Sequence, residues 1–215
     1  MIPQIFKNEN LYDNIIEKYS KMYNVPFPLI KAIITRESNF NPKSYRFESH
    51  RNDASYGLIQ ILYQTAKGLG YTGTPEGLYD TDTNVKYGTL YLSALLKHYK
   101  NLPDTIASYN MGYPRKAKDT TSLIKSIYGT PQPNWIYANQ PYVDYVLAYY
   151  CYYSAIKNKN YSLAWEIRNM ILNKKHGEVW EKYKDKISEN LMASLIRWWI
   201  ALPIGTIVYF LFKRK

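Results

Sequence analysis

The sequence predicts an all-α fold, because apolar residues recur at helical spacing along most of the chain and strand-like alternation is nearly absent. Prolines and capping residues stand where several of these periodic segments begin. The 215 residues, 46% of them hydrophobic, are enough for one sizeable core. We therefore expect one helical domain, with residues left over for an appendage.

Several segments of the chain have the apolar spacing of a helix. In the first of them Leu11, Ile15 and Tyr19 are in line, and Pro26 and Pro28 suit the first turn of the second. Glycine should end the third, and Pro141 should open the fifth. Helices are expected over 10–24, 26–39, 55–70, 80–101, 141–156 and 162–177. Segments rich in Asn, Asp, Gly, Pro and Ser are expected to be loops, at 41–55, 71–82 and 111–141.

The C-terminal segment has the composition of a membrane anchor. Residues 198–212 carry no charge, and three basic residues follow them at 213–215. Counted from Leu191, the segment would be about 33 Å long as a helix, which exceeds the roughly 30 Å of a hydrocarbon core. Arg197 lies near one end, where its side chain can reach the interface. We expect a main domain over 8–157, a helical extension over 158–190 and a transmembrane helix over 191–212.

The net charge of +11 and pI of about 9.4 favour polyanionic partners, such as nucleic acid, an anionic membrane or an acidic cell-wall polymer. No zinc-finger, phosphate-loop or dinucleotide motif is present, so charge alone names no partner. The lone Cys151 is predicted to be a small buried hydrophobe. His50, His98 and His176 do not cluster in sequence, and no metal site is predicted.

Glu37 is unusual because it falls on the same helical stripe as three isoleucines of the segment 26–39. Burial would raise the pKa of its carboxyl, and the negative end of the helix dipole would do the same in the last turn. Both effects favour the protonated form that a general acid needs. The alternative is structural: an ion pair with Arg36 or Lys31, or a side chain turned to solvent.

Five short motifs stand in register along the chain: "ESNFNP", "SYGLIQI", "TAKGLGYTG", "LYDTDTNVKYGTLYL" and "IASYNMG". Their order and spacing resemble the catalytic domain of the soluble lytic transglycosylase family over roughly residues 20–150. The resemblance implies a lysozyme-like α-helical fold that cleaves peptidoglycan glycan strands between N-acetylmuramic acid and N-acetylglucosamine. It also implies that no cofactor is needed.

In that family the glutamate of the Glu-Ser pair is the sole catalytic carboxyl group, and Glu37 matches it. It would protonate the glycosidic oxygen and then take the proton of the muramoyl C6 hydroxyl, which closes a 1,6-anhydro ring. For some of the supporting positions, capping, turn geometry or core packing is an equal alternative. The resemblance implies substrate binding by Ser38, Ser55, Gln60, Tyr109, Asn110 and Tyr142.

The sequence departs from the family pattern in two longer segments. The charged loop 43–52 holds Glu48 and is followed by Asp53, and either could be a second carboxylate that holds a water in a hydrolysing muramidase. We predict instead that both are solvated loop charges. The segment 113–140 is longer than expected. Its basic residues would either grip acidic stem peptides and wall polymers or lie in a solvated loop.

The sequence thus predicts a membrane-anchored lytic transglycosylase acting on the cell wall, with peptidoglycan and membrane as partners. The alternatives are a hydrolysing muramidase and a non-catalytic wall-binding relative. A nucleic-acid partner would account for the net positive charge but for none of the motifs, so no such partner is predicted. No export signal is seen at the N-terminus. Two locations are therefore considered: the internal membrane of a virus particle, or a bacterial cytoplasmic membrane.

Overall fold

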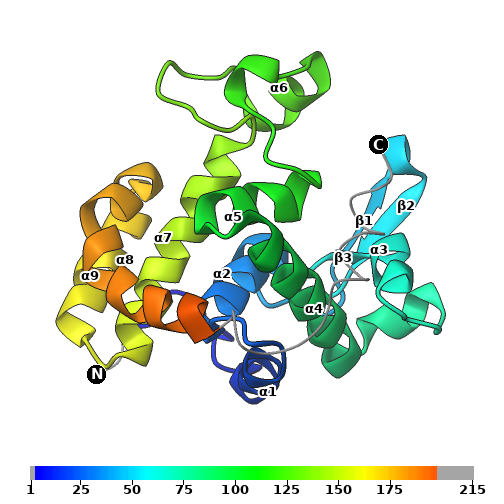
Figure 1. The fold of residues 1–215 in the computed structure, drawn as a ribbon, viewed down its shortest axis with the longest axis horizontal. Helices are drawn as coiled ribbons and strands as arrows, with labels where there is room; N and C mark the ends of the chain where they lie inside the picture. The colour runs from blue at the N-terminus through cyan, green and yellow to red at the C-terminus, as the bar shows by residue number, and fades with distance from the viewer. Residues whose placement is uncertain (1–2, 198–215) are drawn as a thin grey trace.

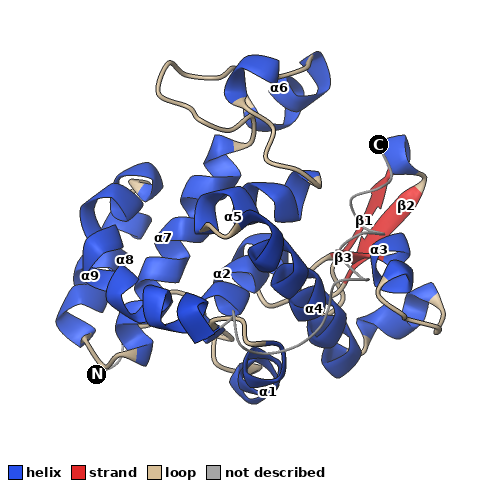
Figure 2. Ribbon diagram, in the orientation of Figure 1, coloured by secondary structure: helices blue, strands red, loops and turns tan. Residues whose placement is uncertain are grey.

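The computed structural model describes residues 3–197, with side chains described to residue 187. The described part is mostly helical, with one small antiparallel sheet at its edge (Figures 1 and 2). Its helices are α1 (Asp13–Tyr23), α2 (Phe27–Ser38), α3 (Tyr63–Gly68), α4 (Thr81–Tyr99), α5 (Leu102–Met111), α6 (Ser122–Tyr128), α7 (Gln140–Lys157), α8 (Tyr161–Leu172) and α9 (His176–Arg197). Its strands are β1 (Tyr45–Glu48), β2 (Asp53–Tyr56) and β3 (Ile61–Leu62).

Helix α7 is the centre of the core and packs against α2, α5, α8 and α9. Large tyrosines fill it, and each buried hydroxyl needs a hydrogen-bond partner. The Tyr152 hydroxyl donates to the Pro3 carbonyl at 2.7 Å, and the Tyr153 and Thr35 hydroxyls lie 3.0 Å apart. These bonds tie α7 to the N-terminal segment and to α2. Cys151 is fully buried on the same helix, as predicted.

The predicted helices with strong start and stop signals are confirmed. Helix α2 ends where Asn39 adopts a left-handed conformation with φ of 51°. Helix α4 begins where the Asp80 side chain accepts a hydrogen bond from the Thr83 amide at 2.8 Å. The first helix is shorter than predicted, because residues 8–12 form turns and Leu11 is 69% exposed. Ile16 and Tyr19 are its buried residues.

The predicted helix over 55–70 is wrong in its first half, and the predicted loop over 41–55 is largely a hairpin. Strand β2 pairs antiparallel with β1 and β3, and a helix starts only at Tyr63. Positive φ angles of 71° at Gly57 and 48° at Gln60 are incompatible with a continuous helix. The buried Asn84 side chain accepts from the Ile59 amide at 3.0 Å and donates to the Tyr56 carbonyl at 2.7 Å. This distant residue on α4 fixes the turn, which local periodicity does not reveal.

The segment 113–140 is also more ordered than the loop that was predicted. It contains α6, which projects from the rest of the fold (Figure 1). Its two ends meet at an antiparallel bridge between Lys116 and Tyr137. The Ala117 amide donates to the Ile136 carbonyl at 3.0 Å beside this bridge. The chain therefore leaves the fold after α5 and returns to it before α7 at adjacent points. We call the segment 113–140 the excursion, and the bridged pair Lys116 and Tyr137 its neck.

The C-terminal helices pack on the other side of α7 from α5 (Figure 1). Ile167 on α8 and Val179 and Tyr183 on α9 are buried in the same core. The predicted helix over 162–177 is two helices, since α8 ends at Leu172 and α9 begins at His176. The transmembrane helix expected over 191–212 lies mostly outside the described residues. Within residues 3–197, each helix is too short or too polar to cross a membrane.

The packing of Gly88 on α4 against Ile59 gives a test of the fold. A Cβ on Gly88 would lie 2.0 Å from Ile59 Cγ2. Overpacking costs about 1–3 kcal/mol, while alanine gains about 1 kcal/mol of helix propensity over glycine. We expect Gly88→Ala to lower the free energy of unfolding by up to about 2 kcal/mol in urea titrations.

The control is the same substitution in an Ile59→Ala background, where the methyl group has room. There Gly88→Ala should be neutral, or stabilising by up to about 1 kcal/mol. An equal loss in both backgrounds would contradict the packing described.

Candidate active site

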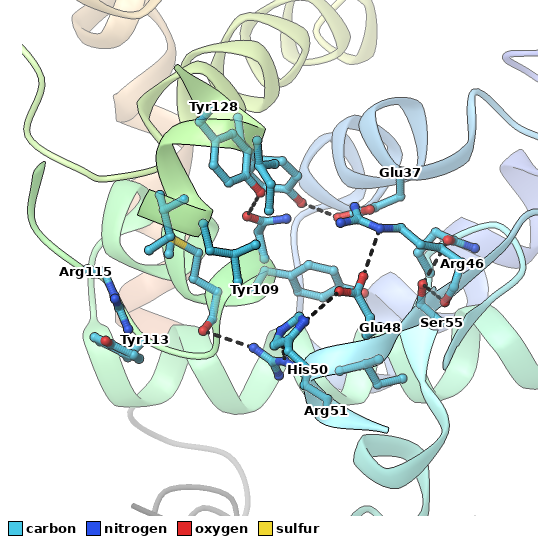
Figure 3. A pocket seen from close by; sticks show the side chains of 18 of the residues that line it. Glu37, Arg46, Glu48, His50, Arg51, Ser55, Tyr109, Tyr113, Arg115 and Tyr128 are labelled. Carbon is cyan, nitrogen blue, oxygen red and sulfur yellow. Dashed lines mark hydrogen bonds and ion pairs between the residues drawn. The ribbon is translucent and has the colours of Figure 1, made fainter. Parts of the chain in front are cut away.

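A cavity of about 420 Å³ opens between the sheet, the ends of α2 and α5, and the excursion that holds α6 (Figure 3). Its lining combines two carboxylates, Glu37 and Glu48, with arginines, tyrosines and a few apolar residues. The size suits a small-molecule or sugar ring, since ligand clefts are commonly 300–1,000 Å³. The cavity is the candidate active site.

Glu37 reaches this cavity from the last turn of α2. The Tyr142 hydroxyl at the start of α7 donates to Glu37 Oε1 at 2.5 Å. Protein atoms surround the carboxyl group, although the residue keeps part of its surface open to the cavity. This burial raises the pKa of Glu37 to about 7, against the lowering effects of the Tyr142 hydrogen bond and of the Arg36 and Arg46 charges.

The basic neighbours considered as ion-pair partners of Glu37 have other contacts. Lys31 is buried, and its Nζ lies 2.7 Å from Asp13 Oδ1. The Arg36 guanidinium lies over the rings of Tyr142 and Tyr145, at 5.5 and 5.3 Å from their centroids. The partner of Glu37 is therefore a neutral hydroxyl, which permits protonation of the carboxyl near pH 7.

Tyr109 and Asn110 line the cavity from the last turn of α5. The Tyr109 hydroxyl donates to the Ile59 carbonyl at 2.9 Å, and burial raises its pKa well above the usual value. Asn110 Oδ1 accepts from the Tyr128 hydroxyl and, at 3.0 Å, from Asn139 Nδ2. Asn110 thereby joins α5 to α6 and to the start of α7.

Ser55 and Gln60 line the cavity from the sheet. The Ser55 hydroxyl donates to Gln60 Oε1 at 3.0 Å. Gln60 Nε2 donates to the carbonyls of Ser44 and Gly57, each at 3.0 Å. The Gln60 side chain therefore holds its own turn in shape while it faces the cavity.

Ser38 is placed differently from the other predicted site residues. Its hydroxyl donates to the Ile34 carbonyl of its own helix at 3.3 Å. The cavity lining includes Glu37, Ser55, Gln60, Tyr109, Asn110 and Tyr142, but does not include Ser38. Substrate contacts of these residues stay predictions.

The prediction that Glu48 and Asp53 are solvated loop charges is wrong. Asp53 is 8% exposed, and its carboxylate accepts from the amides of Ala54 and Gln64, which caps α3. Glu48 lines the cavity and pairs with Arg46 Nε at 3.0 Å. The cause is the hairpin, which turns alternate residues of β1 toward the cavity.

Comparison with known proteins identifies the family. The family described as Transglycosylase SLT domain matches residues 14–124, just over half of the chain. The chain belongs to this family. The resemblance predicted from the five motifs is thus confirmed, and the matched residues hold every predicted site residue except Tyr142.

Solved lytic transglycosylases that match with a TM-score above 0.5 share the fold of this SLT family member. An inactive mutant of lytic transglycosylase Slt from Pseudomonas aeruginosa matches 69% of the chain at 24% identity and a TM-score of 0.54. A 70-kDa soluble lytic transglycosylase in complex with bulgecin A matches 69% at 25% identity and a TM-score of 0.51. The 70-kDa enzyme Slt70 from Escherichia coli matches 66% at 25% identity and a TM-score of 0.48. The matches cover 24% or 25% of those longer chains.

The SLT family member also has cavity residues that the motifs did not indicate. They come from the hairpin and from the excursion 113–140. The sequence shows that both segments are charged, but it does not show that they line the cavity. The residues are Arg46, His50, Arg51, Tyr113, Arg115, Leu123, Ile124, Ile127 and Tyr128. Within residues 3–197 no three His, Cys, Asp or Glu side chains lie close enough to hold a metal ion.

The raised pKa of Glu37 predicts how stability depends on pH. With a pKa near 7 in the folded protein and about 4.5 in the unfolded chain, the stabilising contribution is complete below pH 4.5. It is lost as pH rises to about 7, because the folded state must then hold a buried charge. Glu37→Gln should therefore raise the free energy of unfolding at pH 8, by up to about 3 kcal/mol, and change it little at pH 4. Urea titrations at both pH values test this, and an equal effect at both would contradict it.

Proposed function

We propose that the chain is a peptidoglycan lytic transglycosylase that cleaves the β-1,4 bond between N-acetylmuramic acid and N-acetylglucosamine. The observation that carries the proposal is the enclosed Glu37 carboxyl, bonded to Tyr142 and facing a cavity, in a chain of this family. A pKa of about 7 leaves a substantial protonated fraction at neutral pH. That is the condition for a general acid.

In the first step Glu37 acts as the acid. The Tyr142 hydroxyl donates to Oε1, so the carboxyl proton is carried on Oε2. This proton passes to the glycosidic oxygen as its bond to the muramoyl C1 breaks. The positive charge that develops at C1 is stabilised by the substrate's own N-acetyl group, as the family resemblance implies.

In the second step the same group acts as a base. The Glu37 carboxylate takes the proton of the muramoyl C6 hydroxyl, and O6 forms a bond to C1. The Tyr142 hydroxyl stabilises the carboxylate during the interval, since a hydrogen bond to the charged form favours it. The product is a 1,6-anhydro sugar, and no water is consumed.

The charge of the cavity suits an acidic peptide-bearing strand. Two carboxylates line it, Glu37 and Glu48, against four arginines. Stem peptides of peptidoglycan carry carboxylates, which arginine binds in bidentate geometry. The arginines concerned are Arg36, Arg46, Arg51 and Arg115.

We also propose that residues 191–212 attach the chain to a membrane, on the sequence pattern alone. The uncharged run 198–212 and the basic residues after it support this. Attachment would hold the cavity near the wall, whether in a virion's internal membrane or at a bacterial cytoplasmic membrane. The full chain should float with phosphatidylglycerol vesicles in a density gradient at high salt, and a chain ending before Leu191 should not. Equal behaviour of the two would reject the anchor.

Glu37→Gln tests the enzymatic proposal. Digestion of purified peptidoglycan should release anhydromuropeptides with the natural chain, as read by mass spectrometry. The variant should lose at least a hundredfold in rate, because general acid–base catalysis contributes about 10²–10⁴.

The matched control is Glu166→Gln, which removes a glutamate in an exposed ion pair with Lys182 on another face. It should cleave at the natural rate. Absence of cleavage by the folded natural chain would reject the proposal and favour a wall-binding protein.

A further inference from the structure

Glu48 is a second carboxylate in the same cavity as Glu37. In β1, the side chains of Arg46 and Glu48 both line the cavity, and they are 56% and 17% exposed. Alternate residues of a strand face opposite sides, so Arg46 and Glu48 share the face toward the cavity. Figure 3 shows Glu37, Arg46 and Glu48 gathered at one side of the cavity, from two different elements.

Basic groups hold the Glu48 carboxylate in a defined orientation. Oε1 lies 3.0 Å from Arg46 Nε, and Oε2 lies 3.7 Å from His50 Nδ1. The second distance exceeds a hydrogen bond, so Oε2 has room for another donor.

The neighbouring His50 is itself oriented. Arg51 Nε donates to His50 Nε2 at 3.2 Å, so a neutral imidazole carries its hydrogen on Nδ1, the nitrogen beside Glu48. Arg51 Nη2 also contacts the Met111 carbonyl at the end of α5 at 3.4 Å. The hairpin residues that contact Glu48 are thus linked, through Arg51, to the end of α5.

We propose that Glu48 is a second catalytic carboxylate that binds and deprotonates a water molecule, so that the chain also hydrolyses the bond that it cleaves. This rests on the proposed function, because Glu37 must supply the acid in both reactions. The surroundings of the two carboxyl groups differ. Glu37 accepts a hydrogen bond from the neutral Tyr142 hydroxyl, whereas Glu48 lies between Arg46 and His50.

Both carboxyl groups take part in the hydrolysis. The Glu37 proton passes to the glycosidic oxygen, which keeps the electron pair of the broken bond to C1. The water oxygen forms a bond to C1, and one water proton passes to Glu48. Solvent returns that proton to Glu37, so one water is consumed. The C6 hydroxyl competes with this water for the same carbon, and the two products report how often each reacts.

Product analysis in ¹⁸O-labelled water tests the proposal with the full chain in mild detergent at pH 6. Products are reduced with borohydride at once and separated by mass, since a reduced hydrolysed end is heavier than an anhydro end by one water and two hydrogens. The natural chain should form both, with label only in the hydrolysed ends. Glu48→Gln should lower the ratio of hydrolysed to anhydro ends by at least tenfold. Glu48→Asp should give an intermediate ratio, and Glu166→Gln the natural ratio.

The outcomes separate the two proposals. Anhydro ends alone from the natural chain would overturn the role of Glu48 and leave the transglycosylase intact. An unchanged ratio in Glu48→Gln, with the variant shown to be folded by circular dichroism, would also overturn it. If Glu37→Gln forms neither product while the other variants still form anhydro ends, Glu37 supplies the acid for both reactions. Absence of both from the natural chain would reject the two proposals together.

Discussion

The hydrogen bond between Glu37 and Tyr142 joins the end of α2 to the start of α7, the two helices at the centre of the core. A carboxyl group is expensive to bury, and here the neighbouring hydroxyl offsets part of that cost. The rest of α2 contributes an apolar stripe that includes Ile30, Ile33 and Ile34, all fully buried. Because α2 cannot rotate about its axis without exposing these residues to solvent, the packing of the whole helix sets the position of the Glu37 carboxyl.

The abundance of tyrosine follows from the same arrangement. A helix buried against several neighbours needs large side chains, and a tyrosine adds a hydroxyl that can bind a distant backbone or side-chain group. On α7, Tyr142, Tyr152 and Tyr153 each use their hydroxyl in this way, toward α2 or the N-terminal segment. Tyr109 does the same from α5 toward the turn at Ile59. The tyrosines therefore connect segments that are far apart in sequence.

The acid and the long helices can be predicted from the sequence because their signals are local: an apolar stripe with one carboxylate, an Asp80 cap, a proline at a helix start. The hairpin was not predicted because Gly57 and Gln60 adopt positive φ angles. Asn84, far along the chain, holds the turn that contains them. The orientation of Glu48 depends on strand register, which no periodicity in so short a segment reveals. The helix inside 113–140 was not predicted because its seven residues make only about two turns, too few for a helical period to stand out.

The closed neck of the excursion 113–140 has a consequence for how this fold can vary. The chain enters and leaves the excursion at adjacent points, Lys116 and Tyr137, so the number of residues between them can change while this pair stays in place. The excursion contributes Leu123, Ile124 and Ile127 to the cavity, while Glu37 is held by the core. Insertion and deletion in this segment can therefore reshape what the cavity accommodates and leave the acid in place.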